Sequence, residues 1–174
     1  MKSLVLTVIG DDRPGLVGEL SRLISDQGGN WLESSMAQLA GKFAGILRVD
    51  VADAEAAALI EALEGLEALK VHVTQAGAPP ASGAAPRRLH LTLVGQDRVG
   101  IVREVSQVLA RHRVNVEELN TLTSSAPMSG ETLFHARASL QADRDLDAGA
   151  LKTDLEALSN DLIVDISLDE VVSI

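Results

Sequence analysis

One eight-residue stretch occurs twice in this chain and constrains its fold more than any other feature. Residues 10–17 read Gly-Asp-Asp-Arg-Pro-Gly-Leu-Val, and residues 95–102 read Gly-Gln-Asp-Arg-Val-Gly-Ile-Val, at an offset of 85 residues from Gly10 to Gly95. In both places the stretch ends an apolar run typical of a strand and begins an amphipathic run typical of a helix. Two copies of one strand–turn–helix unit predict two copies of one domain, of about 80 residues each.

The first half of the chain contains the pattern of a ferredoxin-like domain. Alternating and continuous apolar runs predict strands at residues 4–9, 31–39, 43–51 and 70–75, and helical spacing predicts helices at 16–27 and about 54–66. Gly28 and Gly29 are expected to end the first helix, and Asp53 to cap the second. The order βαββαβ predicts an α+β fold with an antiparallel four-stranded sheet and both helices on one face.

The two faces of that sheet are expected to differ. The face with Val5, Thr7 and Ile9 is expected to remain uncovered and, being partly apolar, to need a partner. The face beneath the helices is expected to bury Leu4, Leu6, Val8, Leu16, Leu20, Leu23, Leu47, Val49, Leu59 and Leu63.

The same pattern returns in the second half, after a linker. The composition predicts an N-terminal domain at 1–76, a linker rich in Ala, Pro and Gly at 77–86, and a C-terminal domain at 87–174. Residues 169–174 are expected to form a tail that adds to a strand edge. The predicted strands cover 89–94, 115–124, 131–140 and 162–168, and the predicted helices cover 101–112 and 148–158.

The hairpin of the second half is expected to be the longer one. Matching Val51 to Leu140 gives an offset of 89 residues, which exceeds the repeat offset of 85 by four. We therefore expect four additional residues, in the loop at 126–130.

Composition excludes several classes of function. The net charge of −10 argues against direct binding to nucleic acid, which needs a basic face. The absence of cysteine excludes disulfides, thiolate zinc sites and cysteine nucleophiles, and it fits a reducing compartment. The sequence has no apparent secretory signal and no apolar run of about 18 residues, so we expect a cytoplasmic protein without membrane contact.

The residues that could perform catalysis do not form a recognisable constellation. His90 and His135 are expected on neighbouring strands of an uncovered sheet face, but Arg137 occupies the place where a third metal ligand would be needed. No nucleophile elbow and no phosphate-binding loop is present. We therefore expect no enzyme, no metal and no cofactor.

The repeated turn is the best candidate for a ligand site. A helix that begins after a glycine-containing turn directs free N–H groups and the positive end of its dipole at the turn, which favours an anion such as a carboxylate. Asp12 and Asp97 lie in the two turns, and Asn30 and Asn115 begin the next strands. Each turn and the asparagine of its own domain are expected at opposite ends. They could meet across domains only if the helices pack antiparallel, with Asn115 beside Asp12 and Asn30 beside Asp97.

A second reading of these residues stays open at this point. Asp12 and Asp97 could be turn and helix-capping residues, because aspartate favours both positions. In that reading the two asparagines merely begin strands, and no ligand is bound at either turn.

The motifs resemble those of ACT domains, which are small ligand-sensing modules of amino-acid metabolism. The resemblance rests on residues 12–17, the helix to Gln27 and residues 28–30, and again on residues 97–102 and 114–115. Two such domains that make up nearly the whole chain resemble the glycine cleavage system transcriptional repressor family. The resemblance implies an amino acid held between paired domains. It places the first site at Asp12, Arg13, Pro14, Gly15 and Leu16 with Asn115, and the second at Asp97, Val99, Gly100 and Ile101 with Asn30. Val99 departs from the proline that is usual there.

The same resemblance implies a non-catalytic regulator that senses a small amino acid, for example glycine. Such a repressor acts through a protein partner, for instance a DNA-bound transcription factor, which agrees with the acidic charge; a homodimer is compatible with this reading. A second hypothesis is a regulatory subunit or stand-alone sensor for a metabolic enzyme. A third, a stand-alone catalyst, lacks an acid–base–nucleophile cluster.

Overall fold

The structure is a computed structural model that describes residues 1–77, 86–126 and 130–168. The contacts within it divide the chain into two units, Met1–Pro80 and Ala81–Ile174. Most of the predicted linker at 77–86 lies outside the described residues, as do the middle of the 126–130 loop and the whole 169–174 tail. The two-domain organisation is confirmed, and the domain boundaries stay a prediction.

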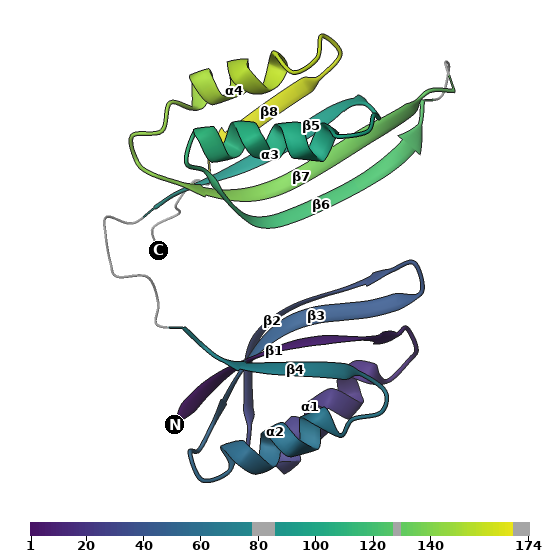
Figure 1. Ribbon diagram of the computed structural model, residues 1–174, viewed down its shortest axis with the longest axis vertical. Coiled ribbons are helices and arrows are strands. Elements are labelled where there is room, and N and C mark those ends of the chain that lie inside the picture. Colours follow the sequence, from purple (N-terminus) through teal and green to yellow (C-terminus); the bar gives the residue numbers. More distant parts are fainter. Residues whose placement is uncertain (78–85, 127–129, 169–174) are drawn as a thin grey trace. The chain divides into compact units, whose positions relative to one another are not determined.

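The first unit is a single antiparallel sheet with two helices on one side (Figure 1). The strand order is β2-β3-β1-β4, which is the ferredoxin-like arrangement expected from the sequence. In chain order the elements are β1 (Lys2–Asp11), α1 (Leu16–Asp26), β2 (Asn30–Leu39), β3 (Lys42–Val51), α2 (Ala56–Glu64) and β4 (Lys70–Gln75).

The second unit repeats this architecture, with the strand order β6-β7-β5-β8. Its helices again lie together on one side of the sheet (Figure 1). In chain order the elements are β5 (Arg87–Gln96), α3 (Ile101–Arg111), β6 (Asn115–Ser125), β7 (Thr132–Ala142), α4 (Ala148–Glu156) and β8 (Ile163–Leu168).

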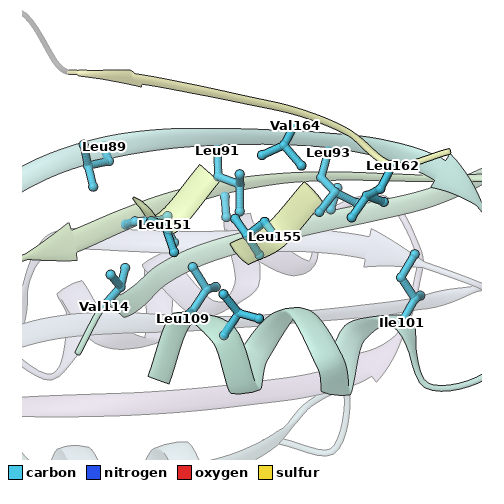
Figure 2. Packing of buried hydrophobic residues seen from close by; sticks show 14 of the residues in the cluster. Leu89, Leu91, Leu93, Ile101, Leu109, Val114, Leu151, Leu155, Leu162 and Val164 are labelled. Carbon is cyan, nitrogen blue, oxygen red and sulfur yellow. The ribbon is translucent and has the colours of Figure 1, made fainter. Parts of the chain in front are cut away.

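Each core lies between one sheet face and the two helices, and it is almost wholly aliphatic. In the first unit the ten residues predicted to be buried all line this core, with Leu23 half-buried. In the second unit the leucines of β5 gather in one cluster with Leu109 of α3 and with Leu151 and Leu155 of α4 (Figure 2). Each fully buried leucine stabilises the fold by about 1.5–3 kcal/mol. Alternate strand residues point away from the helices, so Thr7 and Ile9 are exposed as expected.

The register of the second hairpin corrects the sequence prediction. Lys2, at the start of β1, pairs with Val51, whereas Arg87, at the start of β5, pairs with Ala142. Because Lys2 and Arg87 are 85 residues apart, Val51 corresponds to Ala142 and not to Leu140. The offset is therefore 91, and the second hairpin is longer by six residues rather than four. A slip of two residues preserves which side chains are buried, so hydrophobic alternation could not detect it.

One predicted cap is confirmed and one is wrong. Gly28 adopts a φ of 72°, and the N–H of Gly29 bonds the carbonyl of Ile24 at 2.8 Å, which ends α1 as expected. Asp53 does not cap α2, because the residue before that helix is Glu55. The Asp53 carboxylate instead accepts a 2.6 Å hydrogen bond from the N-terminal ammonium of Met1, a partner that the helix pattern gave no reason to consider.

Among the described residues, the structure contains no helix with the length and apolar character needed to span a membrane.

A matched pair of glycine substitutions tests the packing at the end of β1. A Cβ on Gly10 would lie 2.5 Å from the carbonyl oxygen of Ala68, so Gly10→Ala forces the backbone to move and should destabilise by about 1–3 kcal/mol. Gly18, within α1, has open space around it, so Gly18→Ala should stabilise by roughly 0.5–1 kcal/mol. Urea unfolding of both variants checks this, and a Gly10→Ala variant as stable as the wild type would contradict the close approach.

Candidate functional site

The turn between β1 and α1 has the same backbone shape in both units. The residue immediately before each helix is a glycine in the left-handed region, Gly15 with φ 94° and Gly100 with φ 92°. Side-chain-bearing residues rarely adopt this conformation, so these two glycines are required by the turn itself. The repeated glycine of the motif therefore shapes the turn from which each helix begins.

Each turn is tied to the neighbouring hairpin by one backbone hydrogen bond. The N–H of Asp12 donates to the carbonyl of Gly41 at 2.9 Å, and the N–H of Asp97 donates to that of Thr132 at 2.8 Å. Gly41 and Thr132 lie where the β2–β3 and β6–β7 hairpins turn back. The bond holds the start of the turn against the sheet while the rest of it remains exposed.

The first helical turn of α1 offers unused hydrogen-bond donors. The first bond within the helix runs from the N–H of Glu19 to the carbonyl of Gly15 at 2.9 Å. Within the described residues, no hydrogen bond occupies the N–H groups of Val17 and Gly18. The Leu16 side chain is buried, so this residue can present only its backbone. Ile101 has the same position in the second unit and is also buried.

Both turns contain an ion pair that the sequence prediction missed. The Arg13 guanidinium donates hydrogen bonds of 2.6 and 2.8 Å to the two oxygens of Glu19, and Arg98 donates to Glu104 at 2.5 Å. These hydrogen bonds hold the pKa of each glutamate below its ordinary value. The signal was present in the sequence, because arginine and glutamate are six residues apart in both copies. The Arg13 guanidinium is therefore already engaged by Glu19.

The structure does not support helix capping by the turn aspartates. The residue that precedes each helix is glycine, and neither helix has a side-chain cap. The Asp12 and Asp97 side chains are exposed, and neither has a hydrogen bond or ion pair with the described residues. The capping part of the second reading is therefore wrong, and a free carboxylate remains at each turn.

The second turn is bound more tightly to its surroundings than the first. The N–H of Gln96 donates to Asp161 at 2.7 Å. A hydrogen bond from the Ser159 hydroxyl, and then this bond from Gln96, lower the pKa of Asp161. Arg98 also donates to the Leu158 carbonyl at 3.4 Å. At the position of Pro14, the side chain of Val99 is fully exposed. The two turns thus differ in more than the missing proline.

Each asparagine lies far from the turn of its own unit, as expected. Asn30 pairs with Asp50, which pairs with Ser3 near the start of β1, whereas the turn follows Asp11 at its end. Eight residues of strand lie between the position of Asn30 and the turn, a separation of about 26 Å at roughly 3.3 Å per residue. Asn115 is placed likewise in the second unit. The pairing of Asn115 with Asp12, and of Asn30 with Asp97, stays a prediction.

The histidines form no metal-binding group within the described residues. His135 lies on β7 with its Nε2 atom 2.8 Å from the Ser124 hydroxyl. The Nε2 atom of His112, at the end of α3, lies 2.8 Å from the Oδ2 atom of Asp154 in α4. His90 occupies the same helix-free face as His135, as the sequence predicted.

Comparison with known families identifies the repeated unit. The family model described as the ACT domain matches residues 2–74 and again residues 87–169. The glycine cleavage system transcriptional repressors of Escherichia coli (strain K12) and Shigella flexneri are each 25% identical to the chain over 162 residues, covering 91% of it and 85% of their own length.

Solved structures share the same architecture over the whole chain. A crystal structure of an unknown protein from Galdieria sulphuraria is 32% identical, covers 98% of this chain and 99% of its own, and has a TM-score of 0.83. A second, provisionally named a glycine cleavage system transcriptional repressor, is 20% identical, covers 97% and 98%, and has a TM-score of 0.70, which shows a shared fold.

The ion pair at the first turn predicts a specific dependence on pH. A carbon-detected NMR titration should place the pKa of Glu19 below the ordinary value of about 4.3, because Arg13 stabilises the charged form. Since this pKa is depressed in the folded state, the contribution of the pair to stability is present near pH 7 and is lost as the pH falls through it. Arg13→Gln should raise the pKa of Glu19, and the matched Arg98→Gln should leave it in place. An unchanged midpoint in Arg13→Gln would contradict the pairing.

Proposed function

The chain belongs to the ACT domain family, and on that premise we propose that it is a non-catalytic regulatory protein that binds a small amino acid at the turn between β1 and α1. Glycine is the first candidate, because the curated relatives are named as transcriptional repressors of the glycine cleavage system. The proposed regulator works in the cytoplasm and needs no cofactor.

One observation carries this proposal: within the described residues, the partial positive charge of the helix N-terminus and the negative charge of Asp12 both lack a partner at the same turn. The N–H groups of Val17 and Gly18 and the positive end of the helix dipole favour a carboxylate. The exposed Asp12 carboxylate, a few residues away along the chain, favours an ammonium. A free amino acid carries both groups on neighbouring atoms, so its zwitterion matches the turn, whereas a simple anion would use only half of it.

The proposed roles follow from what each group can offer. Leu16 contributes only its backbone, Gly15 and Pro14 shape the turn, and Arg13 holds the turn through Glu19. Asn115 is proposed to complete the first site, because its amide can donate and accept a hydrogen bond at once. The corresponding second site uses Asp97, Val99, Gly100, Ile101 and Asn30. We expect it to bind more weakly, because its turn is already engaged by Asp161 and by the Leu158 carbonyl.

The proposed output is an interaction with a protein, such as a DNA-bound transcription factor. The chain carries a net charge of −10, which opposes association with the phosphate backbone. The alternative is an ACT-type regulatory subunit or stand-alone sensor for a metabolic enzyme. Affinity purification from cells separates the two, because a transcription factor in the complex supports the first and an enzyme supports the second.

Substitution of Asp12 and Asn115 tests the proposed ligand site. Asp12→Ala and Asn115→Ala should each weaken amino-acid binding by roughly 1–3 kcal/mol, the usual range for losing a hydrogen bond to a charged group. Isothermal titration calorimetry of the wild type and each variant, first with glycine and then with other amino acids, measures the effect. Thermal melts of the same samples should change little, because neither side chain is buried.

The matched changes in the second turn provide the control. Asp97→Ala and Asn30→Ala should leave the tighter binding event intact and affect only a weaker one. If the wild type binds an amino acid and Asp12→Ala and Asn115→Ala bind it equally well, the ligand does not occupy the first turn.

The protein alone should not bind DNA sequence-specifically. Because the net charge of −10 opposes association with the phosphate backbone, gel retardation with duplex DNA from a regulated promoter should show no salt-sensitive shift. Retardation that distinguishes this duplex from a scrambled one would refute action through a partner.

A further inference from the structure

Arg137 stands at the centre of the helix-free face of the second sheet. It lies on β7, a central strand, and is directly paired with Thr92 on β5 and with Asn120 on β6. Its neighbours along the strand, Ala136 and Ala138, are buried on the side of the helices, so Arg137 projects from the opposite face. An arginine guanidinium is thereby flanked by a hydroxyl and a carboxamide.

Two adjoining hollows in this face share these three side chains. One has a volume of about 380 Å³ and also includes His135 and Leu122. The other has a volume of about 230 Å³ and also includes His90 and the acidic Glu118. Arg137 lies on the border between them. A small ligand in either hollow would meet the guanidinium together with hydrogen-bond donors from the neighbouring strands.

The positive charge of Arg137 is not neutralised by an ion pair within the part of the chain that the structure describes. Glu118, on β6, accepts a 2.8 Å hydrogen bond from the amide of Asn120 instead. The first sheet differs, because there Glu33 lies directly opposite Arg48 and the two form an ion pair at 3.2 Å.

The residue in the first sheet that corresponds to Arg137 is apolar. Thr7 and Thr92 are 85 residues apart, and Thr7 pairs with Ile46 just as Thr92 pairs with Arg137. Ile46 is half exposed and lines a hollow of its own with Val5 and Glu33. The same backbone position therefore carries an apolar group in one unit and, in the other, a cation without an ion pair among the described residues. The chain as a whole is strongly acidic.

We propose that the hollow around Arg137 is a second ligand site, separate from the turns, and that it binds a small monocarboxylate. The guanidinium provides a two-point match to a carboxylate. The Thr92 hydroxyl can donate from one side, and Asn120 keeps a second amide hydrogen beyond the one that it donates to Glu118. Glu118 on β6 and Asp165 on β8 lie on the same face, on the two outer strands of the sheet. Their negative charges disfavour phosphate and other multiply charged anions, so a single carboxylate is the ligand chemistry that fits.

A titration with acetate tests this site directly. The ¹⁵N-labelled full-length protein is titrated with sodium acetate at constant ionic strength, and the amide and arginine Nε resonances are followed. The resonances of Thr92, Asn120 and Arg137 should shift together and saturate. Acetamide, which has nearly the same shape without the charge, should produce no saturable shift. Absence of saturation in this patch with acetate, or tighter binding of inorganic phosphate than of acetate, would overturn the proposal.

Two arginine variants and one threonine variant complete the design, and their melting temperatures control for folding. Arg137→Gln should raise the acetate dissociation constant at least tenfold, and Arg48→Gln, the paired arginine of the first sheet, should leave it unchanged. Thr92→Val removes one flanking donor without altering shape and should weaken binding by a smaller factor. Equal binding in the wild type and Arg137→Gln, with equal melting temperatures, refutes the site. Acetate binding at the first turn would instead shift the amide resonances of Val17 and Gly18, and those shifts would persist in Arg137→Gln. The two proposed sites can therefore be refuted independently of each other.

Discussion

Each unit depends on the burial of one aliphatic sheet face beneath two helices. With two phenylalanines, one tryptophan and no tyrosine in the chain, leucine, valine and isoleucine must fill both cores. Strand alternation presents Leu4, Leu6 and Val8 to the helices, and helical spacing returns Leu16 and Leu20 to meet them. Because the helices cover one face only, the opposite face of each sheet is left with exposed side chains. Both sites proposed here lie outside the cores. At these positions the packing of the buried face fixes where the backbone lies but not which exposed side chain it carries.

The turn that leads into the first helix is shaped by two close backbone constraints. At Gly10 the strand passes so near the carbonyl of Ala68 that no side chain fits, and at Gly15 the backbone adopts a left-handed conformation. The hydrogen bond from Asp12 to Gly41 then fixes the turn against the hairpin. A turn held in this way keeps the helix N-terminus open without local rearrangement, which would lower the entropic cost of binding the proposed ligand.

The two units use nearly the same backbone but present different surfaces. In the first, Arg48 pairs with Glu33 on the helix-free face, and the centre is the apolar Ile46. In the second, Asn120 engages Glu118 and the central position is Arg137. The turns diverge as well, since Gln96 and Arg98 of the second turn donate hydrogen bonds to Asp161 and to the Leu158 carbonyl. The chain thus contains two copies of one backbone fold with different exposed side chains, and these differences allow the two copies to bind different ligands.

The sequence by itself determined the duplication, the order of strands and helices, the ferredoxin-like topology and the buried face. These properties depend on local periodicity and on glycines such as Gly15 and Gly28, whose conformational role is set by adjacent residues. The ion pair of Arg13 with Glu19 could also have been predicted, because the same spacing of arginine and glutamate occurs in both copies of the repeat. Only the tertiary structure decided the hairpin register, the pairing of Asp53 with the N-terminus and the placing of Arg137 without an ion pair among the described residues. A two-residue slip leaves hydrophobic alternation unchanged, and partners such as Met1 and Asp53 come together through chain folding over 52 residues, which no local pattern encodes.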